Sequence, residues 1–389
     1  MRILFYELRK IWRLPVVLAV AALGTLTYFG FMHPLLFDGM LQSSPVAERY
    51  EITRSWAARF GAYMDGSEFQ QAKAECKALR QEADAQVAAN PYLSAYGITT
   101  LDGFNAFLDA GLDPKAHALI NDFVVSTRHQ RFWVSEMEGL LKNWETVSPY
   151  YAEYAKNPAL TPAEQARYLD AAGSRLLEGI FCGLDGTLEG YFLWWDLFAT
   201  LSTALLLAPC GAAEWLNRMP ALQWATRTGR RTARYRLAAA LLSAVGLFVL
   251  EALVFCGIYS ASGTWVFWRN PVTSFTFGDV LWFDLTYGEY FLLHLALTLC
   301  LMLGTAGMVF TLSDHSSHYI SALLKAVIPV TGFAAAGVFS VTGLLTSRNP
   351  IYAAARIMGI EAAVCAALSL LGLAAGLLPL FRGQRKELL

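Results

Sequence analysis

The most informative feature of this 389-residue sequence is how little charge it carries. Charged residues make up 16% of the chain and hydrophobic residues 56%, whereas soluble domains are about 25% charged. Alternating segments of about ten residues, which are typical of outer-membrane barrels, are scarce, and apolar residues instead form runs of about 20 residues. The composition therefore excludes a soluble or disordered protein and favours an all-α membrane protein.

Motifs that would give the chain its own chemistry are also missing. It has no Gly-x-x-x-x-Gly-Lys-Ser/Thr loop for ATP phosphates, and no Ser/His, Asp/Asp or His-x-x-x-His group at one membrane depth. His315 and His318 beside Asp314 lack the further ligands that a zinc site needs. Four of the six cysteines lie in apolar runs, which leaves Cys76 and Cys182 as a pair that a disulfide could join. We therefore expect a chain that is not an enzyme and binds no metal or cofactor.

Six apolar runs are long enough to cross a membrane as helices. Residues 1–13, 218–236 and 382–386 hold 13 of the 17 basic residues that lie outside residues 37–190. By the positive-inside rule these segments are cytoplasmic, and an even number of spans places both termini inside. The first run continues to Leu36 without a small-residue cleavage site, so we expect a retained span and not a signal peptide. The six runs lie near residues 14–36, 193–213, 235–260, 290–312, 319–345 and 357–381.

Residues 37–190 have a different character and predict a separate domain. Their net charge is −8, against +7 for the rest of the chain. Asp113-Pro114 and the capping-box sequence Thr161-Pro162-Ala163-Glu164 are helix-start signals. We expect a helical extracytoplasmic domain whose acidity is either an ordinary solvated surface or a docking surface for a cationic peptide. The predicted domains are 1–36, 37–190 and 191–389, and the predicted helices of the outer domain are 46–63, 67–89, 114–145 and 162–180.

Two cytoplasmic segments combine cations with apolar side chains. In residues 2–13 the cations lie on one face of a helix and apolar side chains on the opposite face, which predicts an amphipathic helix lying on anionic lipid. The loop 214–234 is the longest cytoplasmic loop, and its tryptophans and arginines suit a short helix that a soluble partner grips. Arginines that only fix the topology would explain the loop equally well. The cations of the first segment are Arg2, Arg9, Lys10 and Arg13.

These features together resemble a known family. A basic helix YELRKIWR (residues 6–13) leads into the first span, Glu214 ends the second span before a Thr- and Arg-rich loop, and Tyr-Gly-Glu-Tyr-Phe (residues 287–291) opens the fourth. The pattern resembles the permease subunit of bacterial type-2 ATP-binding-cassette (ABC) transporters. The resemblance covers the six-span frame, whereas many members of the family have only short loops where this chain has residues 37–190.

The resemblance implies a function and a set of partners. Residues 2–13 would be an elbow helix, and the loop after Glu214 would dock into a separate ABC ATPase subunit that binds ATP and Mg. A second permease chain, identical or different, would complete the path through the lipid bilayer, and no nucleic acid is involved. We expect a multi-pass protein of the bacterial inner membrane that exports a peptide, lipid or antimicrobial-type substrate. The residues implied in coupling are Glu214, Trp215, Asn217, Arg218, Thr226 and Arg227.

Ionisable residues inside the spans are candidates for the translocation path. Glu251 lies in the outer half of the third span, where an exposed charge would cost about 2.5–3.5 kcal/mol, so it should face protein or water. Asp196, His294 and Glu361 lie nearer the outer ends, where reaching to the headgroups is the simpler expectation. Trp194 and Trp195, with Trp265, Trp268 and Trp282, are expected to form an aromatic belt.

One alternative from another class remains open. A membrane sensor or assembly protein would use the outer helical domain to detect a ligand and would relay the signal without transport. A neighbouring gene for an ATPase favours transport, and one for a histidine kinase favours sensing.

Overall fold

The computed structural model describes residues 2–38, 46–111, 114–173, 184–216, 227–275, 283–341 and 359–385. Within these ranges the chain is helical, with an isolated β-bridge between Pro271 and Thr286. The chain folds into two compact units. Unit 1 contains residues 1–36, 186–263 and 289–389, and unit 2 contains residues 37–185 and 264–288.

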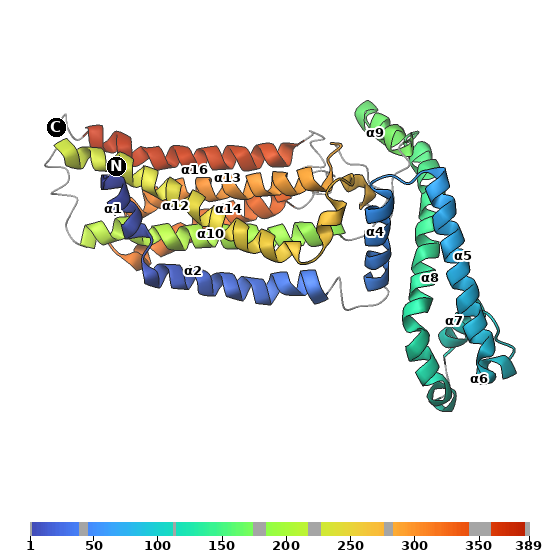
Figure 1. The fold of residues 1–389 in the computed structure, drawn as a ribbon. Helices are drawn as coiled ribbons and strands as arrows, with labels where there is room; N and C mark the ends of the chain where they lie inside the picture. The colour runs from blue at the N-terminus through green and yellow to red at the C-terminus, as the bar shows by residue number, and fades with distance from the viewer. Residues whose placement is uncertain are drawn as a thin grey trace. The chain divides into compact units, whose positions relative to one another are not determined.

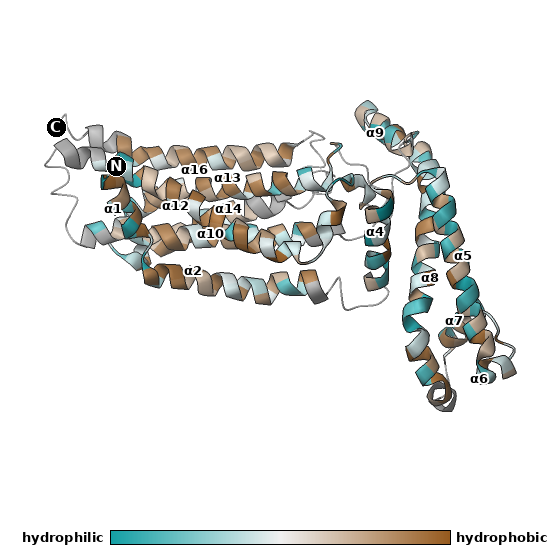
Figure 2. Cartoon of the chain, viewed as in Figure 1, coloured by the Kyte–Doolittle hydropathy of each residue, from teal (hydrophilic) through white to brown (hydrophobic). Residues whose placement is uncertain are grey.

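Unit 1 is a bundle of long apolar helices that run alongside one another (Figure 1). Among the described residues, five helices are long and apolar enough to cross a membrane: Leu14–Leu36, Leu188–Ala212, Thr232–Ser260, Tyr287–Asp314 and Ala362–Leu380. Figure 2 shows their brown, hydrophobic surfaces. The helices of the unit are α1 (Arg2–Ile11), α2 (Leu14–Thr27) with its π-helical continuations η1 (Tyr28–Met32) and η2 (Pro34–Asp38), α10 (Leu184–Leu216), α12 (Arg227–Ser260), α13 (Tyr287–Asp314), α14 (Tyr319–Val341) and α16 (Ile360–Arg385).

The structure therefore supports a multi-pass membrane protein. The remaining predicted span, 319–345, corresponds to α14, whose described side chains form the apolar stretch Tyr319–Ala335. The break between α1 and α2 follows from the sequence. Arg13 is extended, and proline stands in the first turn of α2, where its missing N–H leaves no helix bond unmade.

Glycines bring three helices of unit 1 into backbone contact. A Cβ atom at Gly372 of α16 would lie well inside 3.0 Å of the Gly304 backbone in α13, and one at Gly307 would meet the Gly372 backbone in the same way. Closer to the C-terminal end of α13, a Cβ at Gly211 of α10 would overlap the backbone of Ser313. Only a residue without a side chain permits these crossings.

Unit 2 is built around a helical hairpin in which α5 packs along α8 (Figure 1). Teal residues on α4, α5 and α8 show how much more polar these helices are than those of unit 1 (Figure 2). Small apolar clusters hold the helices together, among them Val87, Leu93, Phe104 and Ile120. The helices are α4 (Val46–Phe60), α5 (Gly66–Ala89), α6 (Pro91–Ala95), α7 (Leu101–Asp109), α8 (Pro114–Tyr154) and α9 (Pro162–Gly173), with the 3-10 helices η3 (Thr264–Phe267) and η4 (Val272–Ser274).

The helix signals of residues 37–190 are largely confirmed. Thr161 and Glu164 form the predicted capping box, because the Thr161 N–H donates to Glu164 Oε2 at 2.6 Å and the Glu164 N–H to Thr161 Oγ1 at 3.3 Å. A second capping box starts α5 at Asp65. Two differences stand out: α8 continues through Pro149 to Tyr154, and the short helices α6 and α7 were not predicted. Asp113 lies outside the described residues.

Candidate functional site

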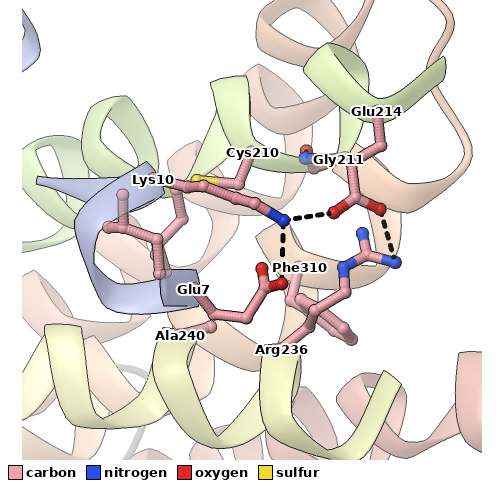
Figure 3. Close-up of a pocket in the computed structure, with 11 residues that line it drawn as sticks. Glu7, Lys10, Cys210, Gly211, Glu214, Arg236, Ala240 and Phe310 are labelled. Carbon is pink, nitrogen blue, oxygen red and sulfur yellow. Dashed lines mark hydrogen bonds and ion pairs between the residues drawn. The ribbon is translucent and has the colours of Figure 1, made fainter. Parts of the chain in front are cut away.

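A small pocket lies at the end of unit 1 that the charge distribution predicts to be cytoplasmic. Four helices line it: α1, α10, α12 and α13. Glu7, Lys10, Glu214 and Arg236 point toward one another across it (Figure 3). Apolar side chains, including Ile11, Leu207 and Phe310, close the rest of the wall. The pocket is therefore a meeting point of charges from segments far apart in the sequence.

The charges form a continuous chain of ion pairs. Lys10 Nζ lies 2.8 Å from Glu7 Oε1 and 3.3 Å from Glu214 Oε1. The other oxygen of Glu214 lies 3.2 Å from Arg236, whose second guanidinium nitrogen lies 2.9 Å from Asp314 Oδ1. We call Glu7, Lys10, Glu214, Arg236 and Asp314 the ion-pair chain. It joins α1, α10, α12 and α13 at one level.

The centre of the ion-pair chain is shielded from solvent. The side chains of Glu214 and Arg236 are only 8% and 12% exposed, whereas that of Lys10 is 39% exposed. Burial alone would lower the pKa of Lys10, but hydrogen bonds and attraction to Glu7 and Glu214 outweigh it, so the pKa lies above its usual value. Removing one partner of such a shielded ion pair strongly destabilises the folded protein.

Helix α1 is amphipathic, as predicted, but one of its cations faces the protein. Lys10 points toward Glu7 and Glu214 and not toward lipid. The prediction that it belongs to the lipid-facing side of the helix is therefore wrong. Ile11 is buried, and the Trp12 indole N–H donates to Ser243 Oγ of α12 at 3.1 Å. Glu7 on the same face, three residues before Lys10, supplies the negative charge that makes this orientation favourable. Helix α1 and Trp12 are thus fixed to α12 by apolar and polar contacts.

A second polar cluster lies within the spans. Glu251 of α12 is 5% exposed; its Oε2 accepts from Trp195 Nε1 at 3.2 Å, and its Oε1 lies 2.7 Å from Ser202 Oγ. Asp196, one residue after Trp195 on α10, is fully buried, and its Oδ1 lies 2.6 Å from Thr298 Oγ1 of α13. The prediction that Glu251 faces protein is therefore confirmed.

His294 is the third ionisable group of this cluster. It is fully buried, stacked on Phe192 at a centroid distance of 4.7 Å and in edge contact with Tyr290 at 4.4 Å. Neither ring nitrogen has a hydrogen-bond partner in the part of the chain that the structure describes, and the same holds for Asp196 Oδ2. The expectation that Asp196 and His294 reach to the headgroups is wrong, because both turn into the bundle. Trp195 is also fully buried, so it does not belong to an aromatic belt.

Several predicted site residues cannot be placed. Among the coupling residues, only Glu214 has a described side chain, and it belongs to the ion-pair chain. Among the path candidates, Glu251 of α12 contacts Trp195 of α10. The next residue of α10, Asp196, contacts Thr298 of α13, and His294 of α13 stacks on Phe192 of α10. Asn217, Arg218 and Thr226 lie outside the described residues, as do the side chains of Trp215, Arg227 and Glu361.

Sequence reasoning missed the partners that complete both sites. Arg236 was counted only as a topology charge, and Asp314 was considered only as a poor metal ligand. The sequence did contain a signal for this pair. Arg236 and Asp314 carry opposite charges, and both lie at the predicted cytoplasmic ends of adjacent spans. Within the described residues, no group of three or more His, Cys, Asp or Glu side chains is arranged to hold a metal ion.

Fold and sites together define a class: an all-helical protein with five candidate membrane-spanning helices and two buried polar centres in unit 1. Comparison with protein-family models, with characterised proteins and with solved structures finds no match. A function must therefore be argued from the chain's own contacts and from the resemblance of its motifs.

Proposed function

We propose that this chain is the membrane permease subunit of a bacterial ABC exporter, in which a separate subunit hydrolyses ATP. The chain would form the path for a peptide, lipid or antimicrobial-type substrate together with a second permease chain. The proposal rests on the motif resemblance and on one observation in unit 1. That observation is the position of the ion-pair chain at the base of the predicted coupling loop.

The ends of this loop are held together by one ion pair. Glu214 is the first residue of the predicted loop 214–234, and Arg236 lies two residues after the end of this loop. A partner that pushes on the loop would therefore move the ends of α10 and α12 as one piece. Asp314 extends this connection to α13, and Lys10 extends it to α1.

Such a junction suits the transmission of force from a cytoplasmic subunit. Buried ion pairs are geometrically demanding and hold a particular arrangement of helices, although they add little net stability. The elbow helix α1 would follow the same motion, because Ile11 and Trp12 anchor it to the bundle. A non-catalytic subunit needs this kind of mechanical link, since its energy comes from a partner.

The first experiment asks whether an ATPase accompanies the chain. The tagged chain is purified from its native membranes after cross-linking, and the co-purifying proteins are identified and assayed for ATP hydrolysis. An ATPase subunit in stoichiometric amount supports the proposal. A folded, monodisperse chain that brings no ATPase contradicts it, and a stoichiometric histidine kinase would favour the sensor alternative.

The second experiment locates the contact. Trp215→Ala combined with Arg218→Glu should weaken association with the ATPase by about 2 kcal/mol or more, about thirty-fold in affinity, because truncated aromatic anchors dominate interface energies. Tyr96→Ala combined with Lys73→Glu is a matched control on exposed residues of unit 2. If both double variants weaken association equally, the loop is not the contact.

A further inference from the structure

We propose that Asp196 and Glu251 each carry a proton in the described conformation, so that the cluster around them is a proton-binding site inside the span bundle. The inference concerns residues of α10, α12 and α13 alone, and it holds whether or not the chain is a permease.

At Glu251, two acceptor oxygens lie near a single hydroxyl hydrogen, that of Ser202. Ser202 Oγ lies 2.7 Å from Glu251 Oε1 and 3.1 Å from the carbonyl oxygen of Ala199 on its own helix. A serine hydroxyl has one hydrogen, and both a carboxylate and a carbonyl only accept. Both contacts are hydrogen bonds at once if the carboxyl is protonated: Glu251 donates to Ser202, and Ser202 donates to Ala199.

The same arrangement recurs at Asp196. Thr298 Oγ1 lies 2.6 Å from Asp196 Oδ1 and 3.0 Å from the carbonyl oxygen of His294 one turn earlier. Again a single hydroxyl hydrogen faces two acceptors unless the carboxyl brings a hydrogen of its own. Two independent carboxyl groups, on different helices, thus show the same requirement for a proton.

The surroundings favour the neutral form of both groups. Asp196 is fully buried and Glu251 is 5% exposed, in helices apolar enough to span a membrane. In the described part of the chain, no Lys or Arg lies within hydrogen-bonding distance of either carboxyl. An uncompensated charge at such depth is costly, whereas a neutral acid with hydrogen-bond partners is accommodated.

The other titratable groups around the cluster are Glu189 and Tyr191 on α10, Cys256 and Tyr259 on α12, Tyr290 and Cys300 on α13, and Cys365 on α16.

His294 gives the cluster a vacant acceptor. Its ring is fully buried and stacked on Phe192, one helical turn before Thr298, and both nitrogens lack partners among the described residues. Asp196 Oδ2 is unpartnered as well. A water entering between α10 and α13 would find acceptors on both sides. Opening of the bundle at this level would therefore hydrate the cluster and release its protons to water.

Infrared spectroscopy of the protein in lipid vesicles tests the proposal directly. A protonated carboxyl has a C=O stretching band that a carboxylate lacks, so the wild type at neutral pH should show this band. Glu251→Gln and Asp196→Asn should each remove about half of its intensity, and the double variant should remove nearly all. Glu289→Gln, at an exposed position of α13, is the matched control and should leave the band unchanged.

Isotope labelling provides the same test without a variant. Carboxyl-¹³C labelling of glutamate alone should shift one part of the band, and labelling of aspartate alone should shift the other part. A wild-type protein with no such band at neutral pH overturns the proposal. So does a band that persists unchanged in the double variant, or one that shifts with neither label.

Discussion

Removal of Arg236 offers the sharpest test of the ion-pair chain. Arg236 contacts Glu214 at 3.2 Å and Asp314 at 2.9 Å, and its side chain is 12% exposed. Removing one partner of a buried ion pair costs about 3–5 kcal/mol, since the other charge is left buried and unpaired. Glu214 keeps a contact with Lys10, so we expect Arg236→Gln to lose about 3 kcal/mol of unfolding free energy, at the lower end of that range.

The measurement is a reversible denaturation of the purified protein in mixed micelles. Arg13→Gln is the control in the same unit, because Arg13 is exposed and donates a long, 3.4 Å hydrogen bond to Tyr319; it should lose less than about 1 kcal/mol. Adding Glu214→Gln to Arg236→Gln should recover part of the loss, because it removes the buried carboxylate that is left with Lys10 in place of two cationic partners. Equal losses for Arg236→Gln and Arg13→Gln, or no recovery in the double variant, would refute the reasoning.

Three further predictions concern packing, reactivity and capping. Gly372→Ala should destabilise the protein by about 1–3 kcal/mol because its Cβ would overlap α13, whereas Gly257→Ala, with open space around it, should be neutral or stabilising in the same denaturation experiment. Burial raises the pKa of the Cys76 thiol to about 11, so its alkylation by iodoacetamide at pH 8, followed by mass spectrometry, should be much slower in the folded than in the unfolded protein; equal rates would contradict this. Asp65→Ala should cost about 1 kcal/mol in thermal unfolding of unit 2, and an unchanged midpoint would mean that the cap at α5 contributes nothing.

The sequence was sufficient for features that depend on local pattern. Runs of apolar residues predict spans because a membrane helix must be apolar along most of its length, and the Thr161 capping box is contained in four consecutive residues. The passage of α8 through Pro149 was missed, because packing against neighbouring helices can compensate for a local pattern that predicts a helix end.

The two polar centres depend on pairs that no local pattern reveals. Trp195 belongs with Glu251 because of how α10 is rotated against α12, and that rotation is set by packing over the whole bundle. A tryptophan near the end of a span is as consistent with an interface belt as with a buried hydrogen bond. Lys10 was placed toward lipid for the same reason, since its partner Glu214 is 204 positions away.

The glycine crossings have a consequence for which parts of unit 1 can slide. Where Gly372 meets α13 and Gly211 meets Ser313, backbone rests on backbone, with no layer of side chains that could change rotamer to absorb a displacement. Helices α10, α13 and α16 should therefore move together at the level of these crossings, in the half of α13 that ends at Asp314. Helix α2 with its continuation η1 is different: little of this span is buried, and it touches α10 through side chains such as Phe31 on Trp194. Helix α2 can therefore shift against α10 by a change of side-chain rotamers, without movement at the glycine crossings.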